Sequence, residues 1–181
     1  MKIAGLTYIS SGKQMMYLKP DTALLVNRKP FFLPHFTEQI DAHPAVVARI
    51  DRMGRCIAEK FAGRYYSLTA PAINFNARLK EGEDTLDCLT KSFVFDNSMA
   101  VGSFAENNKE KLEWYYNGIT LSLHTLLEDM NKAIAEVSSY VTLRTGDMVA
   151  VDYVSEPLEI SRNDEFSVKS DSEDILFCRI K

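Results

Sequence analysis

The chain has 181 residues, a formal net charge of −4, 46% hydrophobic residues and 25% charged residues. This length allows one domain with a sizeable core, and the composition excludes a disordered or fibrous protein. Because the lysines and arginines are scattered, the charge pattern offers no footprint for a nucleic-acid backbone or an anionic membrane. We therefore expect a single domain over residues 1–181 that has neither nucleic acid nor a membrane as a partner.

The three cysteines, Cys56, Cys88 and Cys178, are odd in number and far apart in the sequence. Such spacing favours free thiols, buried as small residues in a reducing compartment, over a disulfide framework. The N-terminal residues contain no apolar run of signal-peptide length, and no segment approaches the roughly 18 apolar residues of a membrane span. These features predict a cytoplasmic protein.

Apolar runs rich in β-formers alternate with turn signals along the first half of the chain. Residues 2–8 and 15–19 read as strands separated by a Ser-Gly turn, and Pro20-Asp21 marks another turn. The run 45–50 has Val46, Val47 and Ile50 as its apolar content and reads as a buried strand headed by His43. Residues 69–79 are extended after Pro71.

Two stretches carry helical periodicity. Ile57, Phe61 and Tyr65 recur every four residues, and a longer apolar stripe runs from about Leu123 to Tyr140. His124 lies off that stripe. Between the two stretches, Asn117-Gly118 predicts a two-residue hairpin turn. After the second stretch, residues 165–180 read as two strands joined by a polar loop. The pattern predicts a strand-rich α+β domain with about two helices.

Several blocks occur in the order found in the fumarylacetoacetate hydrolase family. They are KPDTALL with PFFLP, then AINFNARL, LTKSFVFDNSMAVGSF and SSYVTLRTGDMV. The chain resembles the shorter bacterial members of that family from about residue 15 to residue 155. The resemblance implies a mixed β-roll fold like that of the family's C-terminal domain, a homodimer, and Mg²⁺- or Mn²⁺-dependent hydrolysis, decarboxylation, isomerisation or hydration of small β-keto and diketo acids.

The resemblance also places the family's metal ligands on this sequence. Its Glu-x-Glu falls on His43-Pro44-Ala45, and its aspartate falls on Asn74. Two carboxylates at i and i+2 of a strand converge on one hard cation, whereas an imidazole, a methyl group and an amide supply no negative charge. At these degenerate metal positions, His43, Ala45 and Asn74, we expect no metal and no cofactor.

Other family features are also absent. The His-x-x-Glu lid has no counterpart, the pocket-lining Gly-Thr-Pro reads Val151-Asp152-Tyr153, and a family glutamine is Glu81. Two cations match the family: Arg78 and Lys91, which in active members resemble partners for substrate charge. If the protein is active, these two are its expected catalytic residues; otherwise they hold a small carboxylate or make ordinary surface ion pairs.

Three hypotheses stay open at this point. The first is a catalytically inactive family member, a pseudoenzyme that binds a small acid. The second is an active hydrolase, decarboxylase or hydratase of small β-keto or diketo acids with relocated ligands, in which Asp41, His43 and either Glu38 or Asn74 hold a metal such as Zn²⁺. The third is an assembly partner that forms a homodimer or a mixed dimer with an active relative.

Overall fold

The computed structural model describes residues 1–8, 14–78, 90–106, 112–123 and 125–181. The elements are β1 (Lys2–Tyr8), β2 (Gln14–Pro20), the 3-10 turn η1 (Asp21–Ala23), β3 (Leu24–Val26), β4 (Gln39–Ile50), α1 (Glu59–Ala62), β5 (Tyr66–Arg78), a short helix at 90–93, β6 (Met99–Val101), β7 (Ala105–Glu106), β8 (Glu113–Tyr116), β9 (Ile119–Leu121), α3 (Met130–Tyr140), β10 (Met148–Asp152), β11 (Leu158–Ile160), β12 (Glu165–Ser170) and β13 (Glu173–Arg179). The predicted turn at residues 10–13 lies outside the described residues, as do Glu81, Cys88 and His124.

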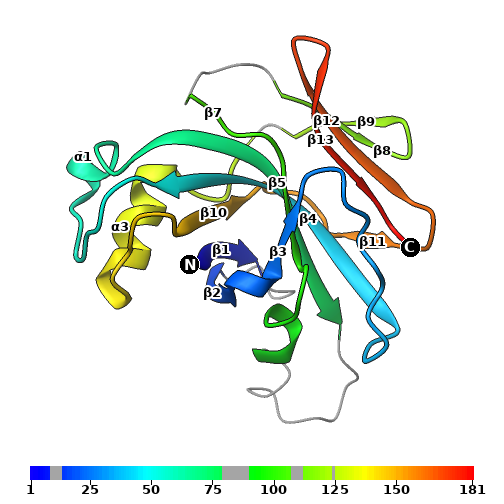
Figure 1. The fold of residues 1–181 in the computed structure, drawn as a ribbon, viewed down its shortest axis with the longest axis horizontal. Helices are drawn as coiled ribbons and strands as arrows, with labels where there is room; N and C mark the ends of the chain where they lie inside the picture. The colour runs from blue at the N-terminus through cyan, green and yellow to red at the C-terminus, as the bar shows by residue number, and fades with distance from the viewer. Residues whose placement is uncertain (9–13, 79–89, 107–111, 124) are drawn as a thin grey trace.

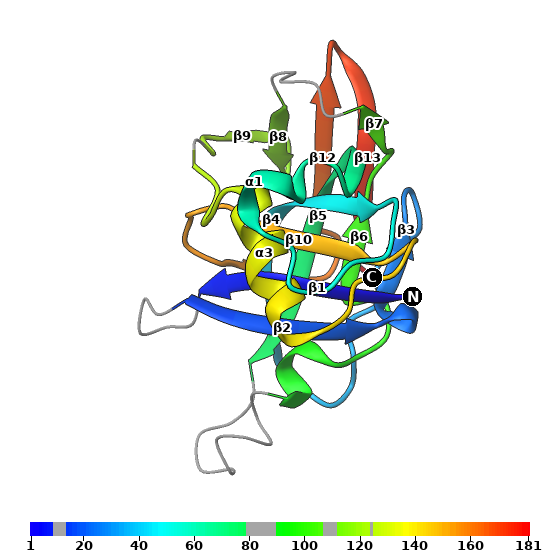
Figure 2. The same ribbon diagram turned by 90° about the vertical axis from the view of Figure 1, so that its left-hand side faces the viewer.

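Most strands form one mixed, curled sheet (Figures 1 and 2). Among the described residues its order is β2-β1-β10-β4-β5-β6-β3, with β11 also paired to β4 and β7 to β5. Strand β10 runs parallel to β1 and antiparallel to β4. A second, antiparallel sheet in the order β13-β12-β8-β9 packs beside β4 and β5. The predicted strand-rich fold with a rolled sheet is confirmed.

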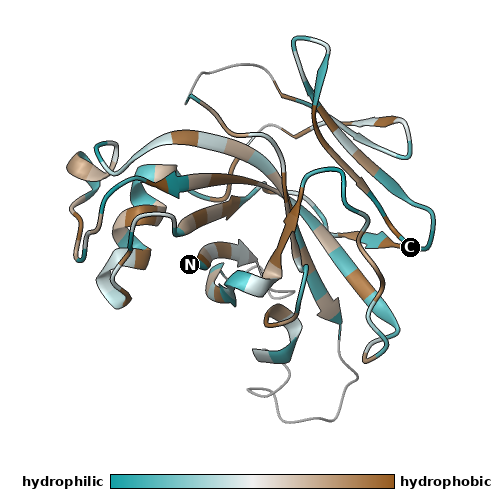
Figure 3. Ribbon diagram, in the orientation of Figure 1, coloured by the Kyte–Doolittle hydropathy of each residue, from teal (hydrophilic) through white to brown (hydrophobic). Residues whose placement is uncertain are grey.

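The middle strands are buried on both faces, which explains their nearly continuous apolar sequence. Alternate residues of β4 enter different cores: Ala42 packs under the second sheet, Ala48 packs under the helices, and Ala45 and Val47 line the concave side of the roll. In Figure 3, β10 is largely brown, whereas the loop between β12 and β13 is teal. We call the concave side of the roll the inner face.

Helix α3 covers the outer side of β1 and β10. Its buried residues Met130, Ala133, Ile134 and Val137 follow the predicted helical stripe. However, the helix begins at Met130 and not near Leu123, because the Asp129 side chain caps it by accepting a hydrogen bond from the Asn131 amide.

The residues just before α3 are not helical, and their backbone pairs with the end of β10 and the residues that follow it. The Leu127 amide donates to the Asp152 carbonyl, and the Val154 amide donates to the Thr125 carbonyl. Tertiary pairing therefore overrides the helical periodicity of this stretch.

The structure confirms some of the remaining local predictions and contradicts others. The Asn117-Gly118 turn joins β8 to β9 with positive φ at both residues, as predicted. The expected helix around Phe61 shrinks to the four residues of α1. Cys178 is buried as predicted, but Cys56 is exposed, so the expectation of a buried residue is wrong there. No helix in the described part of the chain is long and apolar enough to cross a membrane.

Gly5 is required by the ring of Tyr17 on the neighbouring strand. A Cβ built at Gly5 would lie 2.3 Å from Tyr17 Cζ. Tyr17 is 4% exposed and stacks on Phe93 with ring centroids 5.3 Å apart, so the ring has little room to retreat. We expect Gly5→Ala to lower the free energy of unfolding by about 1–3 kcal/mol, the usual cost of overpacking.

Urea denaturation checks the Gly5 prediction. The double variant Gly5→Ala/Tyr17→Ala removes the obstructing ring, so the alanine at position 5 should cost much less in that background. If Gly5→Ala cost the same in both backgrounds, the collision with Tyr17 would not be its cause.

Candidate functional site

The register of three strands brings the predicted degenerate positions together. His43 of β4 lies opposite Asn74 of β5, and Ala45 lies between Ala72 of β5 and Asp152 of β10. Because side chains alternate across a sheet, these residues share the inner face. The structure therefore places the three residues that the resemblance assigns to metal positions side by side, with Asp152 added.

Lys19 of β2 lies on this inner face and is 1% exposed. Its Nζ donates to the Phe75 carbonyl (2.9 Å), the Ser98 carbonyl (3.2 Å) and Ser98 Oγ (3.0 Å). It also lies 5.3–5.8 Å from the ring centroids of Tyr17, Phe93 and Phe95. Three acceptors match the three hydrogens of an ammonium group, and the rings favour the same charged form.

Asp152 is 1% exposed and is held by Asn74. The Asn74 Nδ2 atom donates to Asp152 Oδ2 at 3.1 Å and to Oδ1 at 3.4 Å. Burial raises the pKa of Asp152 to about 7, against the opposing effects of its hydrogen bonds and of Lys19, and burial lowers the pKa of Lys19 to about 7. The site therefore holds two buried ionisable groups whose pKa values both lie close to 7.

His43 is 8% exposed on the same face. Burial lowers its pKa to about 4; Asp41 raises the value, and Lys19 lowers it further. The imidazole is therefore neutral at pH 7, with one donor and one acceptor nitrogen.

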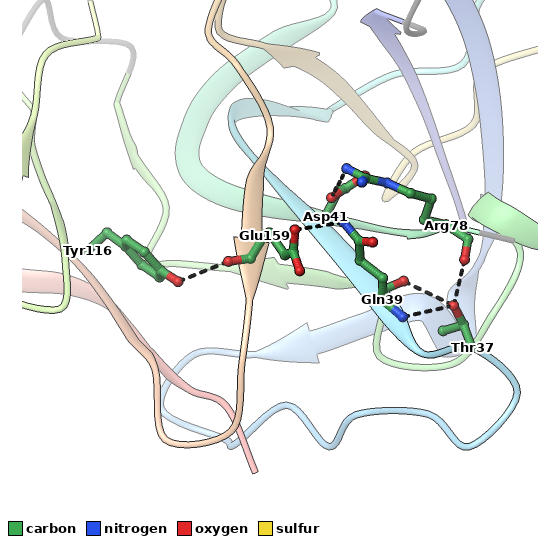
Figure 4. A network of polar contacts seen from close by, with 6 residues as sticks. All are labelled: Thr37, Gln39, Asp41, Arg78, Tyr116 and Glu159. Atoms are coloured by element: carbon green, nitrogen blue, oxygen red, sulfur yellow. Dashed lines mark hydrogen bonds and ion pairs between the residues drawn. The ribbon is translucent and has the colours of Figure 1, made fainter.

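Arg78 belongs to a polar network at the rim of the roll (Figure 4). Its guanidinium donates from Nε and Nη2 to the two carboxylate oxygens of Asp41, at 2.8–3.0 Å. The network continues as Thr37 donates to the Arg78 carbonyl, Gln39 donates to Glu159, and Tyr116 donates to the Glu159 carbonyl. It ties the ends of β4 and β5 to β11 and the second sheet.

The two predicted catalytic cations are much more exposed to solvent than Lys19. Arg78 is occupied by Asp41, with half of its side chain exposed. Lys91 is exposed in the short helix at 90–93, two residues before the buried ring of Phe93.

Removal of Arg78 should have a small effect. An exposed ion pair contributes less than about 1 kcal/mol, so Arg78→Gln should leave the urea midpoint nearly unchanged. Equilibrium denaturation beside the wild-type protein checks this, with Arg179→Gln as a matched control, since Arg179 pairs with Glu165 at a similarly exposed position. A loss of several kcal/mol would mean that the network in Figure 4 is a main support of the fold.

The donor groups at the inner face fit a divalent cation poorly. His43 brings one imidazole, Ala45 brings no ligand, and Asn74 has only its Oδ1 to offer because its Nδ2 is bound to Asp152. Lys19 also lies on this face, and its protonated form repels a second cation. In the part of the chain that the structure describes, no three His, Cys, Asp or Glu side chains group closely enough to hold a metal ion.

Sequence reasoning missed Lys19 and Tyr17. They occupy alternate positions of β2, so the period-2 pattern could have put both on one face, but a lysine in a strand ordinarily points to solvent. Asp152 was noted only as a departure from a family motif. Its burial depends on β10 lying between β1 and β4, which the sequence alone does not indicate.

No protein-family model and no curated protein sequence matches the chain. Solved structures do. A protein from Escherichia coli, provisionally called an isomerase, superposes with a TM-score of 0.84 at 21% identity over 99% of this chain and 91% of its own. A 5-carboxymethyl-2-hydroxymuconate delta-isomerase from Mycobacterium smegmatis superposes with a TM-score of 0.81 at 16% identity over 99% and 78%.

A third similar structure bears the family name directly. It is a provisionally assigned fumarylacetoacetate hydrolase family protein from Yersinia pestis CO92, with a TM-score of 0.81 at 18% identity, covering 99% of this chain and 92% of that one. Identities this low establish the fold alone. The resemblance first seen in the sequence blocks is thus confirmed at that level, and the chain has the fold of the fumarylacetoacetate hydrolase family proteins.

Proposed function

We propose that this protein is a catalytically inactive relative of the metal-dependent enzymes with this fold, and that its inner face binds a small carboxylic acid without a divalent metal. The observation that carries the proposal is the buried set formed by Lys19, Asp152 and Asn74 beside His43 and Ala45. When it is protonated, the Lys19 side chain supplies a positive charge in a place where the resemblance implies a cation.

The electrostatics of the inner face support an acidic ligand. Because a water-excluded site strengthens charge interactions, the Lys19 ammonium attracts an anion even though all three of its hydrogens are already used. The neutral imidazole of His43 and the hydroxyl of Tyr17 are candidates to donate hydrogen bonds to a carboxylate.

The alternative, an active enzyme with relocated ligands, would require Asp41 and His43 to share a metal. These residues are two apart on β4, and the charge of Asp41 reaches His43. However, both carboxylate oxygens of Asp41 accept hydrogen bonds from Arg78, so a metal would have to break a bidentate ion pair. This geometry favours the metal-free proposal.

The assembly role is a second candidate, favoured by exposed aromatic rings. Phe32 is 65% exposed and Phe36 is 53% exposed, both in the segment between β3 and β4. Large exposed apolar side chains gathered in one segment are typical of protein contacts. We propose a homodimer or a mixed dimer with an active relative, in the cytoplasm. Light scattering after gel filtration, and co-purification with such a relative, test it; a monomer that captures no relative would contradict it.

Turnover is the direct test of the inactive state. Protein purified from a host lacking active homologues is assayed with oxaloacetate and acylpyruvates in Mg²⁺, in Mn²⁺ and in EDTA. We expect no enzymatic turnover in any of the three conditions. Activity that EDTA abolishes, and that His43→Ala abolishes while the protein stays folded, would support the relocated-ligand enzyme and overturn the proposal.

A further inference from the structure

The loop between β4 and α1 lies at one end of the molecule, on the left in Figure 1, beside the chain that follows each of the two helices. The Gly54 and Leu143 backbones exchange two hydrogen bonds, which hold the loop to the chain after α3. The Asp51 amide donates to the Tyr65 carbonyl, which holds the loop to the chain after α1. This end gathers five exposed cations, which we call the basic patch: Arg52, Arg55, Lys60, Arg64 and Arg144.

The four arginines of the basic patch form no ion pair with any described residue, whereas Arg78 and Arg179 are each bound to a carboxylate. The sequence from residue 51 to residue 65 contains only two acids, Asp51 and Glu59. A chain with a net charge of −4 therefore carries a positively charged end. Because guanidinium groups bind phosphate oxygens well, this end fits a surface that bears phosphates.

Exposed apolar side chains lie among these cations. Met53 is 69% exposed between Arg52 and Arg55, Phe61 of α1 is 41% exposed, and Tyr140 at the end of α3 is 67% exposed. A backbone hydrogen bond between the loop and the last turn of α3 brings these side chains to the same end. Apolar side chains surrounded by cations are typical of proteins that bind the surface of an anionic bilayer, where apolar groups enter the headgroup region and cations meet lipid phosphates.

The apolar side chains favour a bilayer over a nucleic acid. The Lys60 Nζ atom and the Arg64 Cζ atom lie 5.0 Å and 4.9 Å from the centroid of the Phe61 ring. A ring that cations already cover is a poor platform for the base stacking on which single-stranded nucleic acids depend. Met53 has no ring to offer a base, but its side chain gains free energy wherever it leaves water.

We propose that the basic patch docks this protein reversibly on an anionic phospholipid bilayer, with Met53 and Phe61 entering the headgroup region. The spacing of cations along the sequence predicts no membrane partner, but the fold brings Arg144 beside the β4–α1 loop. The patch lies on the side of the sheet that carries α1 and α3, so docking leaves the inner face free. The inference therefore does not depend on the proposed acid-binding function.

Co-sedimentation of the full chain with lipid vesicles tests the proposal. Phosphatidylglycerol vesicles should bind the protein at about 0.1 M salt and release it at about 1 M salt, where the screening length falls from about 10 Å to about 3 Å. Phosphatidylcholine vesicles should not bind it. Equal binding to both lipids, or binding to neither, would overturn the proposal. So would binding of a single-stranded oligonucleotide by a protein that leaves the anionic vesicles unbound.

Charge reversal assigns the binding to the patch. Arg52→Glu/Arg55→Glu should weaken binding to phosphatidylglycerol vesicles about 25-fold or more, because each cation near an anionic surface contributes roughly fivefold. Lys29→Glu/Arg162→Glu is the matched control. It changes the net charge equally at two exposed positions, in the β3–β4 and β11–β12 connections on the right in Figure 1. If the control lost as much binding, net charge and not the patch would be the cause, and the proposal would fail.

Two further variants complete the test. Arg64→Glu/Arg144→Glu should reproduce the loss from the other side of the patch, and it replaces the first variant should that one fail to fold. Met53→Gln should weaken binding while the salt dependence stays unchanged, because it removes an apolar contact and no charge. Wild-type affinity in Arg64→Glu/Arg144→Glu would overturn the proposed docking surface.

Discussion

Replacement of Lys19 by methionine should lower the free energy of unfolding by about 3 kcal/mol, the order expected when one member of a buried charged set is removed. Methionine fills a similar volume but removes the three hydrogen bonds that Lys19 Nζ donates to the Phe75 carbonyl, the Ser98 carbonyl and Ser98 Oγ. It also leaves Asp152 buried without its nearby positive charge. Urea denaturation followed by the fluorescence of the buried Trp114 measures the loss.

Two comparisons sharpen the Lys19 prediction. The double variant Lys19→Met/Asp152→Asn removes both charges and should recover part of the loss, because an amide is much cheaper to bury than an unpaired carboxylate. Lys132→Met, at a 56% exposed lysine on α3, should leave the midpoint unchanged. If Lys19→Met were as stable as the wild-type protein, Lys19 would not be a buried structural ammonium.

Acidification below pH 6.5 should destabilise the protein through His43. In the unfolded chain this histidine takes up a proton near pH 6.5, whereas burial lowers its folded pKa to about 4. The unfolded state therefore binds more protons between these values, so stability is present above pH 6.5 and is lost as the pH falls toward 4. The full loss from this one group is about 3 kcal/mol.

The His43 contribution is isolated by variants, since carboxyl groups titrate in the same range. His43→Gln should lose less stability than the wild-type protein between pH 7 and pH 4.5, whereas His35→Gln, at an exposed position, should lose the same amount as the wild type. Urea midpoints measured across this range give the comparison. Parallel wild-type and His43→Gln curves would show that His43 is protonated as readily in the folded protein as in the unfolded chain.

Local patterns predicted much of the fold because short-range chemistry decides them. The Asn117-Gly118 turn needs positive φ at two positions, and the apolar content of β4 marks a buried strand wherever it lies. The predicted beginning of α3 was wrong because residues 125–127 pair with the end of β10 and with Val154 just after it, which is a long-range effect. Family likeness, and not periodicity, indicated the rolled sheet.

In the candidate site, too, some features could be predicted from the sequence, whereas others depend on long-range contacts. The pairing of His43 with Asn74 follows from the resemblance, and the register agrees with it. The buried ammonium of Lys19 depends on carbonyls of residues 75 and 98, which lie far away in the sequence. A single sequence contains no local signal for such a contact, so the residue at the centre of the proposed site had to come from the structure.

The central claim is that the inner face binds a small carboxylic acid without a metal. Calorimetric titration of the wild-type protein with malate, once in EDTA and once with excess Mg²⁺, tests it most directly. Saturable binding with one site per chain and the same affinity in both buffers is the predicted result, with Tyr17→Phe weakening it equally in both. Binding that appears only with Mg²⁺ would contradict the account.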